Sequence, residues 1–126
     1  MGANRGERGV SGGSFNYLFR TTDLEDLWRK RKEIYKVIGC LYAQGFEDAA
    51  DEFTAFYESL DNAVNPYTED REPAHGLENW WEQLRWVAKG LEWWQSGDTR
   101  RDQFRQNWDD YKNTNGFPKV HEVDNQ

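Results

Sequence analysis

The sequence predicts an all-α protein: a compact bundle of three long helices plus a shorter fourth, preceded by a flexible glycine-rich arm. Three observations support this fold class. Apolar residues recur at three- and four-residue steps over four stretches, no stretch alternates with the two-residue period of a strand, and 126 residues is the size of one domain. We expect residues 1–14 to form the arm, residues 15–112 the helical domain and residues 113–126 a polar tail.

Aromatic residues replace aliphatic ones as the main material of the predicted core. Seven Trp, seven Phe and six Tyr make up 16% of the chain, whereas hydrophobic residues of all kinds reach only 37%. Each buried ring removes about 150–250 Å² from water, so a few helices suffice to form a core. The single cysteine, Cys40, cannot form an internal disulfide, so stability has to come from packing.

The first helix is expected to begin at Thr22, because Thr22 and Glu25 fit a Thr-x-x-Glu capping box. Its apolar stripe continues to Tyr42, and Gly45 is a natural stop, which together predict one helix of about six turns. Ahead of this helix, a short apolar cluster within residues 15–19 is expected to tie the arm to the body.

The second and third stripes predict two more long helices. The second runs from Phe46 to Leu60 and follows Gly45 directly, which favours a helical hairpin with the first. The third begins at Leu77 and ends before Gly97. At 100° per residue, its core face is expected to consist of Trp81, Leu84, Val87, Ala88 and Leu91.

The fourth predicted helix is shorter. Phe104, Trp108 and Tyr111 fall at i, i+4 and i+7, so they share one face. Asp98 or Thr99 is expected to cap its start.

The net charge of −7 and the pI near 4.8 limit the partners that this chain can bind. A general nucleic-acid coat or an anionic-membrane binder needs a cationic surface, so we expect neither direct duplex binding nor membrane binding. The N-terminus has no apolar run behind its charges, and the expected location is the cytoplasm.

Partner-binding candidates fall on the second and third helices. Residues 46–82 carry eleven Asp or Glu against one Lys or Arg, which makes Asp48 and Asp51 candidates for an acidic binding surface. On the third helix, Trp86 and Trp93 lie seven residues apart and outside the predicted core face. Rings in that position usually face a second helix, another protomer or a partner, so a homo-oligomer is one of the possible outcomes.

The arm has the residue types of an anion site. Glycines let backbone N–H groups converge on an anion, arginines donate in pairs to phosphate, and serines add hydroxyl donors. The candidate ligand-binding residues are Arg5, Arg8, Ser11, Gly12, Gly13, Ser14 and Tyr17.

No spacing in the chain is typical of an enzyme, a metal site or a cofactor site, so we expect no catalytic residue, no metal and no cofactor. A calcium loop between Asp61 and Glu72 has Ala63 at the third position, where a ligand is needed, and Pro66 at the position of the glycine. A magnesium-dependent nucleotide pyrophosphohydrolase is the distant alternative, and it lacks the Glu-x-x-Glu pairing of that family. Its candidate carboxylates would be Asp48, Asp51, Glu52, Glu78 and Glu82.

Two segments resemble small uncharacterised proteins of bacteriophages and prophages. They are the Arg-Gly-x-x-Gly-Gly-Ser-Phe-x-Tyr run from Arg8 to Tyr17 and the Trp-Trp-Gln-Ser-Gly-Asp run from Trp93 to Asp98. The resemblance implies a viral accessory protein. Two functional hypotheses follow: sequestration of an anionic, nucleotide-like ligand as a counter-defence, or inhibition of a host defence or transcription protein through the acidic and Trp-rich helical surface.

Overall fold

The computed structural model describes residues 14–69 and 76–115, and every regular element within them is helical. A short 3₁₀ helix, η1, precedes five α-helices. Their bounds are η1 Leu18–Arg20, α2 Leu24–Arg29, α3 Arg31–Ala43, α4 Glu47–Val64, α5 Leu77–Gln95 and α6 Arg101–Asn115. The predicted all-α fold class is confirmed.

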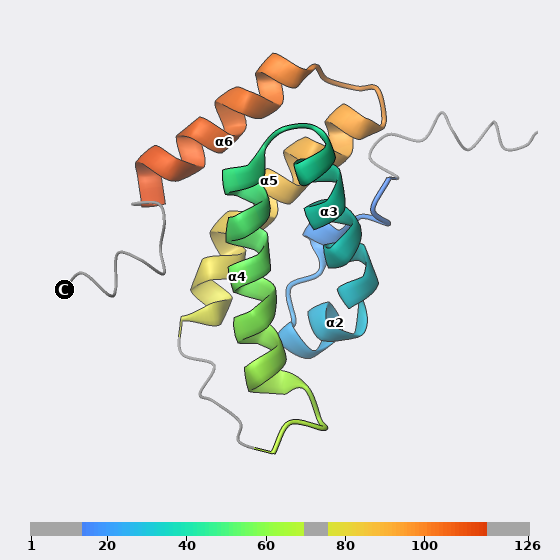
Figure 1. Ribbon diagram of the computed structural model, residues 1–126, viewed down its shortest axis with the longest axis vertical. Helices are drawn as coiled ribbons and strands as arrows, with labels where there is room; N and C mark the ends of the chain where they lie inside the picture. The colour runs from blue at the N-terminus through green and yellow to red at the C-terminus, as the bar shows by residue number, and fades with distance from the viewer. Residues whose placement is uncertain (1–13, 70–75, 116–126) are drawn as a thin grey trace, which may run out of the picture.

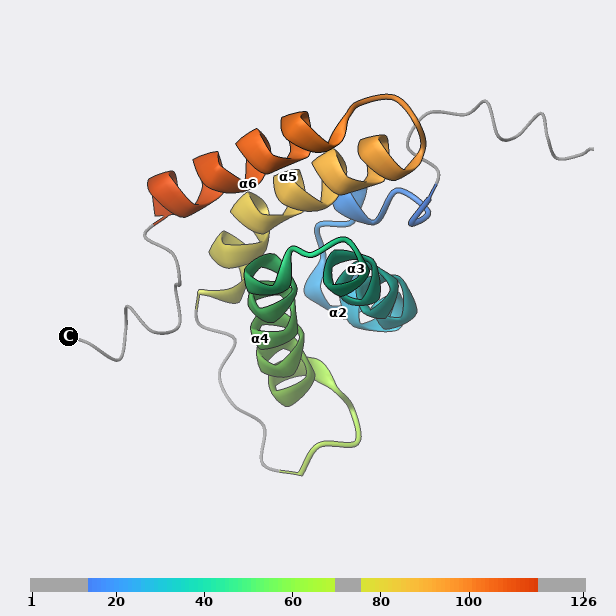
Figure 2. The ribbon, with the colours of Figure 1, turned by 45° about the horizontal axis from the view of Figure 1, so that its top comes forward.

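Two helical hairpins packed on each other make up the fold (Figure 1). α3 and α4 lie side by side and form the first hairpin, with α2 against its open end. α5 and α6 form the second hairpin, and η1 packs on α5. Figure 2 shows that the second hairpin crosses the first, so each hairpin keeps one outward face.

The core centres on α5. Its predicted core face is buried as expected, with no more than 1% of any of these residues exposed: Trp81, Leu84, Val87, Ala88 and Leu91. Phe56 of α4 packs against two α5 rings, with its centroid 5.3 Å from that of Trp80 and 5.3 Å from that of Trp81. The core is therefore built largely of rings, as the composition predicts.

The ends of the elements match the sequence signals in part. The N-terminal apolar cluster is confirmed, because Phe15, Leu18 and Phe19 are all buried. Gly45 and Gly97 have positive φ angles of 88° and 89° after α3 and α5, the left-handed conformation expected at these stops. α6 continues to Asn115, three residues beyond the predicted boundary at 112.

The prediction of one continuous first helix is wrong. The helix breaks at Lys30, whose φ of −96° and ψ of 22° separate α2 from α3. Residues 29–33 contain no apolar side chain. This stretch therefore makes no apolar packing contact with the core that would stabilise a continuous helix. At the break, the guanidinium of Arg31 donates to the carbonyl oxygen of Trp28 over 3.1 Å.

The predicted helix caps are also corrected. Asp23, one residue after Thr22, is the N-cap of α2, and its side chain accepts the Asp26 N–H over 3.1 Å. A carboxylate suits this position because it is charged as well as a hydrogen-bond acceptor. α6 begins later than Asp98 or Thr99 would require, at Arg101.

A buried carboxylate joins three helices. Glu52 of α4 is 2% exposed, and its Oε2 accepts Trp80 Nε1–H of α5 over 3.1 Å and Tyr111 O–H of α6 over 2.6 Å. Burial, followed by the hydrogen bond to Glu52, raises the pKa of Tyr111 far above its ordinary value. The phenol therefore stays protonated and remains a donor.

Trp81→Ala should destabilise the protein far more than Trp86→Ala. Trp81 is 1% exposed and its indole N–H donates to the Thr21 carbonyl over 2.6 Å, whereas Trp86 is 43% exposed. We expect Trp81→Ala to lower the free energy of unfolding by about 3–5 kcal/mol and Trp86→Ala by less than about 1 kcal/mol. Denaturant melts of both variants test this, and equal midpoints would contradict it.

Two helical glycines should respond in opposite ways to alanine. A Cβ on Gly39 of α3 would meet nothing within 4 Å, so Gly39→Ala should stabilise by about 0.5–1 kcal/mol through helix propensity. A Cβ on Gly90 of α5 would lie 2.7 Å from Oδ1 of Asn107 on α6. Gly90→Ala should therefore lower the melting temperature, and adding Asn107→Ala should restore it. A stabilising Gly90→Ala would show that α6 approaches α5 less closely.

Candidate partner-binding site

The predicted arm site is described only at its inner end. Arg5, Arg8, Ser11, Gly12 and Gly13 lie outside the described residues. Ser14 and Tyr17 lie within them, and both have partners inside the domain. The Ser14 and Ser96 hydroxyls are 2.9 Å apart, and the Tyr17 backbone N–H donates to Glu92 Oε2 over 2.7 Å.

Backbone N–H groups do converge on an anion at this end of the arm, and the anion is the protein's own Glu92. The N–H groups of Phe15 and Tyr17 donate to the same oxygen, Oε2, over 3.0 and 2.7 Å. Asn16 and Tyr17 adopt positive φ angles of 54° and 56°, which turn successive N–H groups toward one side. The strain of two left-handed residues is thus offset by charge-assisted hydrogen bonds.

Glu92 is a site residue that no sequence motif predicts. It is fully buried, and its second oxygen, Oε1, has no hydrogen-bond partner. One signal was present: Glu92 follows Ala88 by four residues, so a charged residue lies on the core face of α5.

Burial dominates the protonation of Glu92. Desolvation raises the pKa of its carboxyl, the N–H groups of Tyr17 and Phe15 lower it, and the negative charge of Glu33 raises it again. The balance is a pKa above the ordinary value of 4.5. Glu33 itself accepts the Asn16 side-chain amide over 2.8 Å and pairs with Lys36 at 3.3 Å.

The raised pKa of Glu92 predicts a pH-dependent stability. The folded state binds this proton more tightly than the unfolded state, so the contribution is present below about pH 4.5 and is lost as the pH rises through the folded pKa. Glu92→Gln cannot titrate. The unfolding free energy of the wild type, minus that of Glu92→Gln, should therefore grow as the pH falls from 7 toward 4.5. Urea melts across this range measure the difference, and a difference that shrinks on acidification would contradict the assignment.

Asp48 and Asp51 of α4 also have partners within the domain. Asp48 Oδ2 accepts the indole N–H of Trp108 over 3.1 Å and lies 3.4 Å from Lys112 Nζ. Although partial burial raises the pKa of Asp48, the hydrogen bonds from Trp108 and the charge of Lys112 give a pKa below its ordinary value. Asp51 Oδ1 accepts the Tyr42 hydroxyl over 2.6 Å. The acidity of α4 therefore serves packing as well as solvation.

Trp86 and Trp93 have different surroundings. Trp86 is the only exposed residue among the seven tryptophans, all of which are described. Trp93 is half-buried, with its ring edge-to-face against Phe19 at a centroid distance of 5.3 Å. The Lys89 ammonium lies between the two indoles, 5.2 Å from the Trp86 centroid and 5.6 Å from the Trp93 centroid. The expectation that both rings lie outside the core holds for Trp86 and only partly for Trp93.

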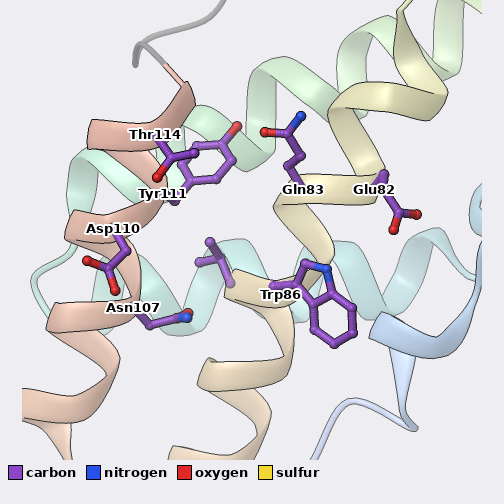
Figure 3. A pocket seen from close by; sticks show the side chains of 8 residues that line it. Glu82, Gln83, Trp86, Asn107, Asp110, Tyr111 and Thr114 are labelled. Atoms are coloured by element: carbon purple, nitrogen blue, oxygen red, sulfur yellow. The ribbon is translucent and has the colours of Figure 1, made fainter.

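A groove of about 310 Å³ lies beside Trp86, between α5 and α6. In Figure 3, Glu82, Gln83 and Trp86 come from α5, and the opposite wall comes from α6. The residues of that wall are Asn107, Asp110, Tyr111 and Thr114. Val87 completes the lining, so an apolar surface is bordered by polar groups on both sides.

Hydrogen-bond acceptors predominate among the polar groups of the groove. Glu82 pairs with Arg85 at 3.2 Å, and Asp110 accepts the Gln106 amide over 2.9 Å. Asn107 Oδ1 is buried without a hydrogen-bond partner. Of these residues the sequence predicted only Trp86 as a partner-binding site and Glu82 as a carboxylate of the pyrophosphohydrolase alternative, because the groove forms where two helices meet and neither helix shows it alone.

The described residues hold no cluster of three or more His, Cys, Asp or Glu that could bind a metal ion. The carboxylates of the pyrophosphohydrolase hypothesis do not converge, since Glu52 is bound by Trp80 and Tyr111 and Asp48 by Trp108. Asp61, the first residue of the hypothetical calcium loop, accepts the indole N–H of Trp28 over 3.0 Å.

Comparison of the chain with protein-family models, with curated proteins and with solved structures finds no match. Among the helices of the described residues, none has both the length and the apolar composition needed to cross a bilayer.

Proposed function

We propose that this chain is a non-catalytic, bacteriophage-type accessory protein that binds and blocks a host protein in the cytoplasm through the α5–α6 groove. The exposure of Trp86 carries the proposal. A chain that buries or half-buries six of its seven tryptophans leaves this one 43% exposed, on the edge of a groove of about 310 Å³. Tryptophan next to an apolar groove is typical of binding hot spots.

The surroundings of Trp86 favour a protein partner. The Arg85 guanidinium lies 4.4 Å from its ring centroid and the Lys89 ammonium 5.2 Å, so cation–π contacts hold the indole in place. A ring that is held before binding loses little conformational entropy on binding. Across the groove, the exposed carboxylate of Asp110 offers oxygen atoms to a partner that brings donor groups.

Trp86→Ala should weaken partner binding by about 2 kcal/mol, roughly thirtyfold in Kd, because it removes the exposed ring of the site. The measurement is capture from bacterial host lysate on immobilised protein, followed by titration of the captured protein. Tyr67→Ala is the matched control, since Tyr67 is an exposed aromatic residue far from the groove lining and is 86% exposed. Equal binding by both variants would overturn the proposal.

The anion-binding arm is the second candidate function. It is supported by the residue types of the arm, whose arginines Arg5 and Arg8 and glycines suit a phosphate, since the N–H groups of Phe15 and Tyr17 are already taken by Glu92. Deleting residues 1–13 should then abolish binding of a nucleotide while the helical domain stays folded, and added salt should weaken that binding. If the groove is the site instead, the truncated protein keeps its host partner, and Trp86→Ala loses it.

A further inference from the structure

The outward face of the α3–α4 hairpin carries a second group of exposed rings. We call it the tyrosine face and define it as Tyr35, Gly39 and Tyr42 of α3 with Tyr57 of α4. Tyr35 is 54% exposed and Tyr42 is 48% exposed. Figure 1 shows this hairpin in front of α5, so the tyrosine face and the α5–α6 groove belong to different hairpins.

The tyrosine rings are held by hydrogen bonds across the hairpin. The Tyr35 and Tyr57 hydroxyls are 3.0 Å apart and their ring centroids 5.0 Å apart. The Tyr42 hydroxyl donates to Asp51 Oδ1 over 2.6 Å. Rings fixed in this way present a rigid apolar surface whose burial costs little side-chain entropy.

Gly39 lies between the two exposed α3 tyrosines, four residues after Tyr35 and three before Tyr42. It is exposed, and a Cβ at this position would meet nothing within 4 Å. A glycine inside a helix costs about 1 kcal/mol relative to alanine, and packing within the protomer does not require this one. Its absent side chain leaves room for a second helix to approach α3.

Charge divides the tyrosine face lengthwise. On α3 the exposed charged residues are Lys32 and Lys36. On α4 they are Glu47, Asp51 and Glu58, together with Asp48 at the edge. One side of the face is therefore basic and the other acidic.

We infer that a second copy of this chain covers the tyrosine face in a symmetric dimer, with α3 of each protomer on α4 of its partner. A two-fold axis parallel to the hairpin sets the basic helix of one copy against the acidic helix of the other, twice. Pairing α3 with α3 would oppose like charges. The face is thus complementary to itself, and Gly39 allows the backbones to come close.

Charge reversal tests this arrangement in the full chain. Lys32→Glu and Glu58→Lys should each raise the dimer Kd about tenfold, because the two-fold axis repeats each unfavourable pair. An equimolar mixture of the two variants should associate as tightly as the wild type, since every reversed charge then meets its opposite. Sedimentation equilibrium measures all three samples. Asp110→Lys, a charge reversal in the α5–α6 groove, is the matched control and should leave the dimer unchanged.

A steric variant separates the interface from the fold. Gly39→Gln removes the glycine from a site with no neighbours within 4 Å, so the protomer should stay folded, with an unchanged helical circular dichroism spectrum. The added side chain fills the space at the centre of the face, so the protein should become monomeric. A monomeric wild type, a dimeric Gly39→Gln, or a mixture that fails to recover would each overturn the inference.

Discussion

The structure depends on a requirement of its buried tryptophans: an indole N–H removed from water needs an acceptor. A core made of rings rather than aliphatic side chains meets this requirement repeatedly. Carboxylates of α4 supply most of the acceptors, and the donor–acceptor pairs are Trp80 with Glu52, Trp108 with Asp48, and Trp28 with Asp61. α4 is therefore tied to α5, α6 and α2 by carboxylates on different sides of the helix.

This use of carboxylates changes how the acidic charge of the chain is interpreted. Judged from its sequence alone, a helix rich in Asp and Glu is expected to form a solvated surface or an electrostatic binding site. In the fold, much of that acidity satisfies donors that packing would otherwise leave unpaired. Glu92 has the same role for backbone N–H groups, and it fixes the chain that enters the domain at Phe15 and Tyr17. What is left for binding is the surface where aromatic rings stay exposed.

Two surfaces meet that condition, and they lie on different hairpins. The α5–α6 groove is asymmetric, with an exposed indole on one wall and oxygen atoms on the other, which suits a partner of different structure. The tyrosine face is divided into a basic and an acidic half, which suits a copy of itself. If both are used, the dimer presents two grooves, and a partner with two binding sites would be held by avidity as well as affinity.

The sequence by itself determined the helical class, the four apolar stripes, the glycine stops and the assignment of Trp81 to the core and Trp86 to the surface. These features follow from local periodicity, which says which side of a helix is apolar. Only the tertiary structure decided the break at Lys30, the two backbone N–H groups that bind Glu92 and the groove between α5 and α6. Periodicity does not say which acceptor a polar atom will meet, because Glu92 and its two N–H donors are 75 and 77 residues apart in the chain.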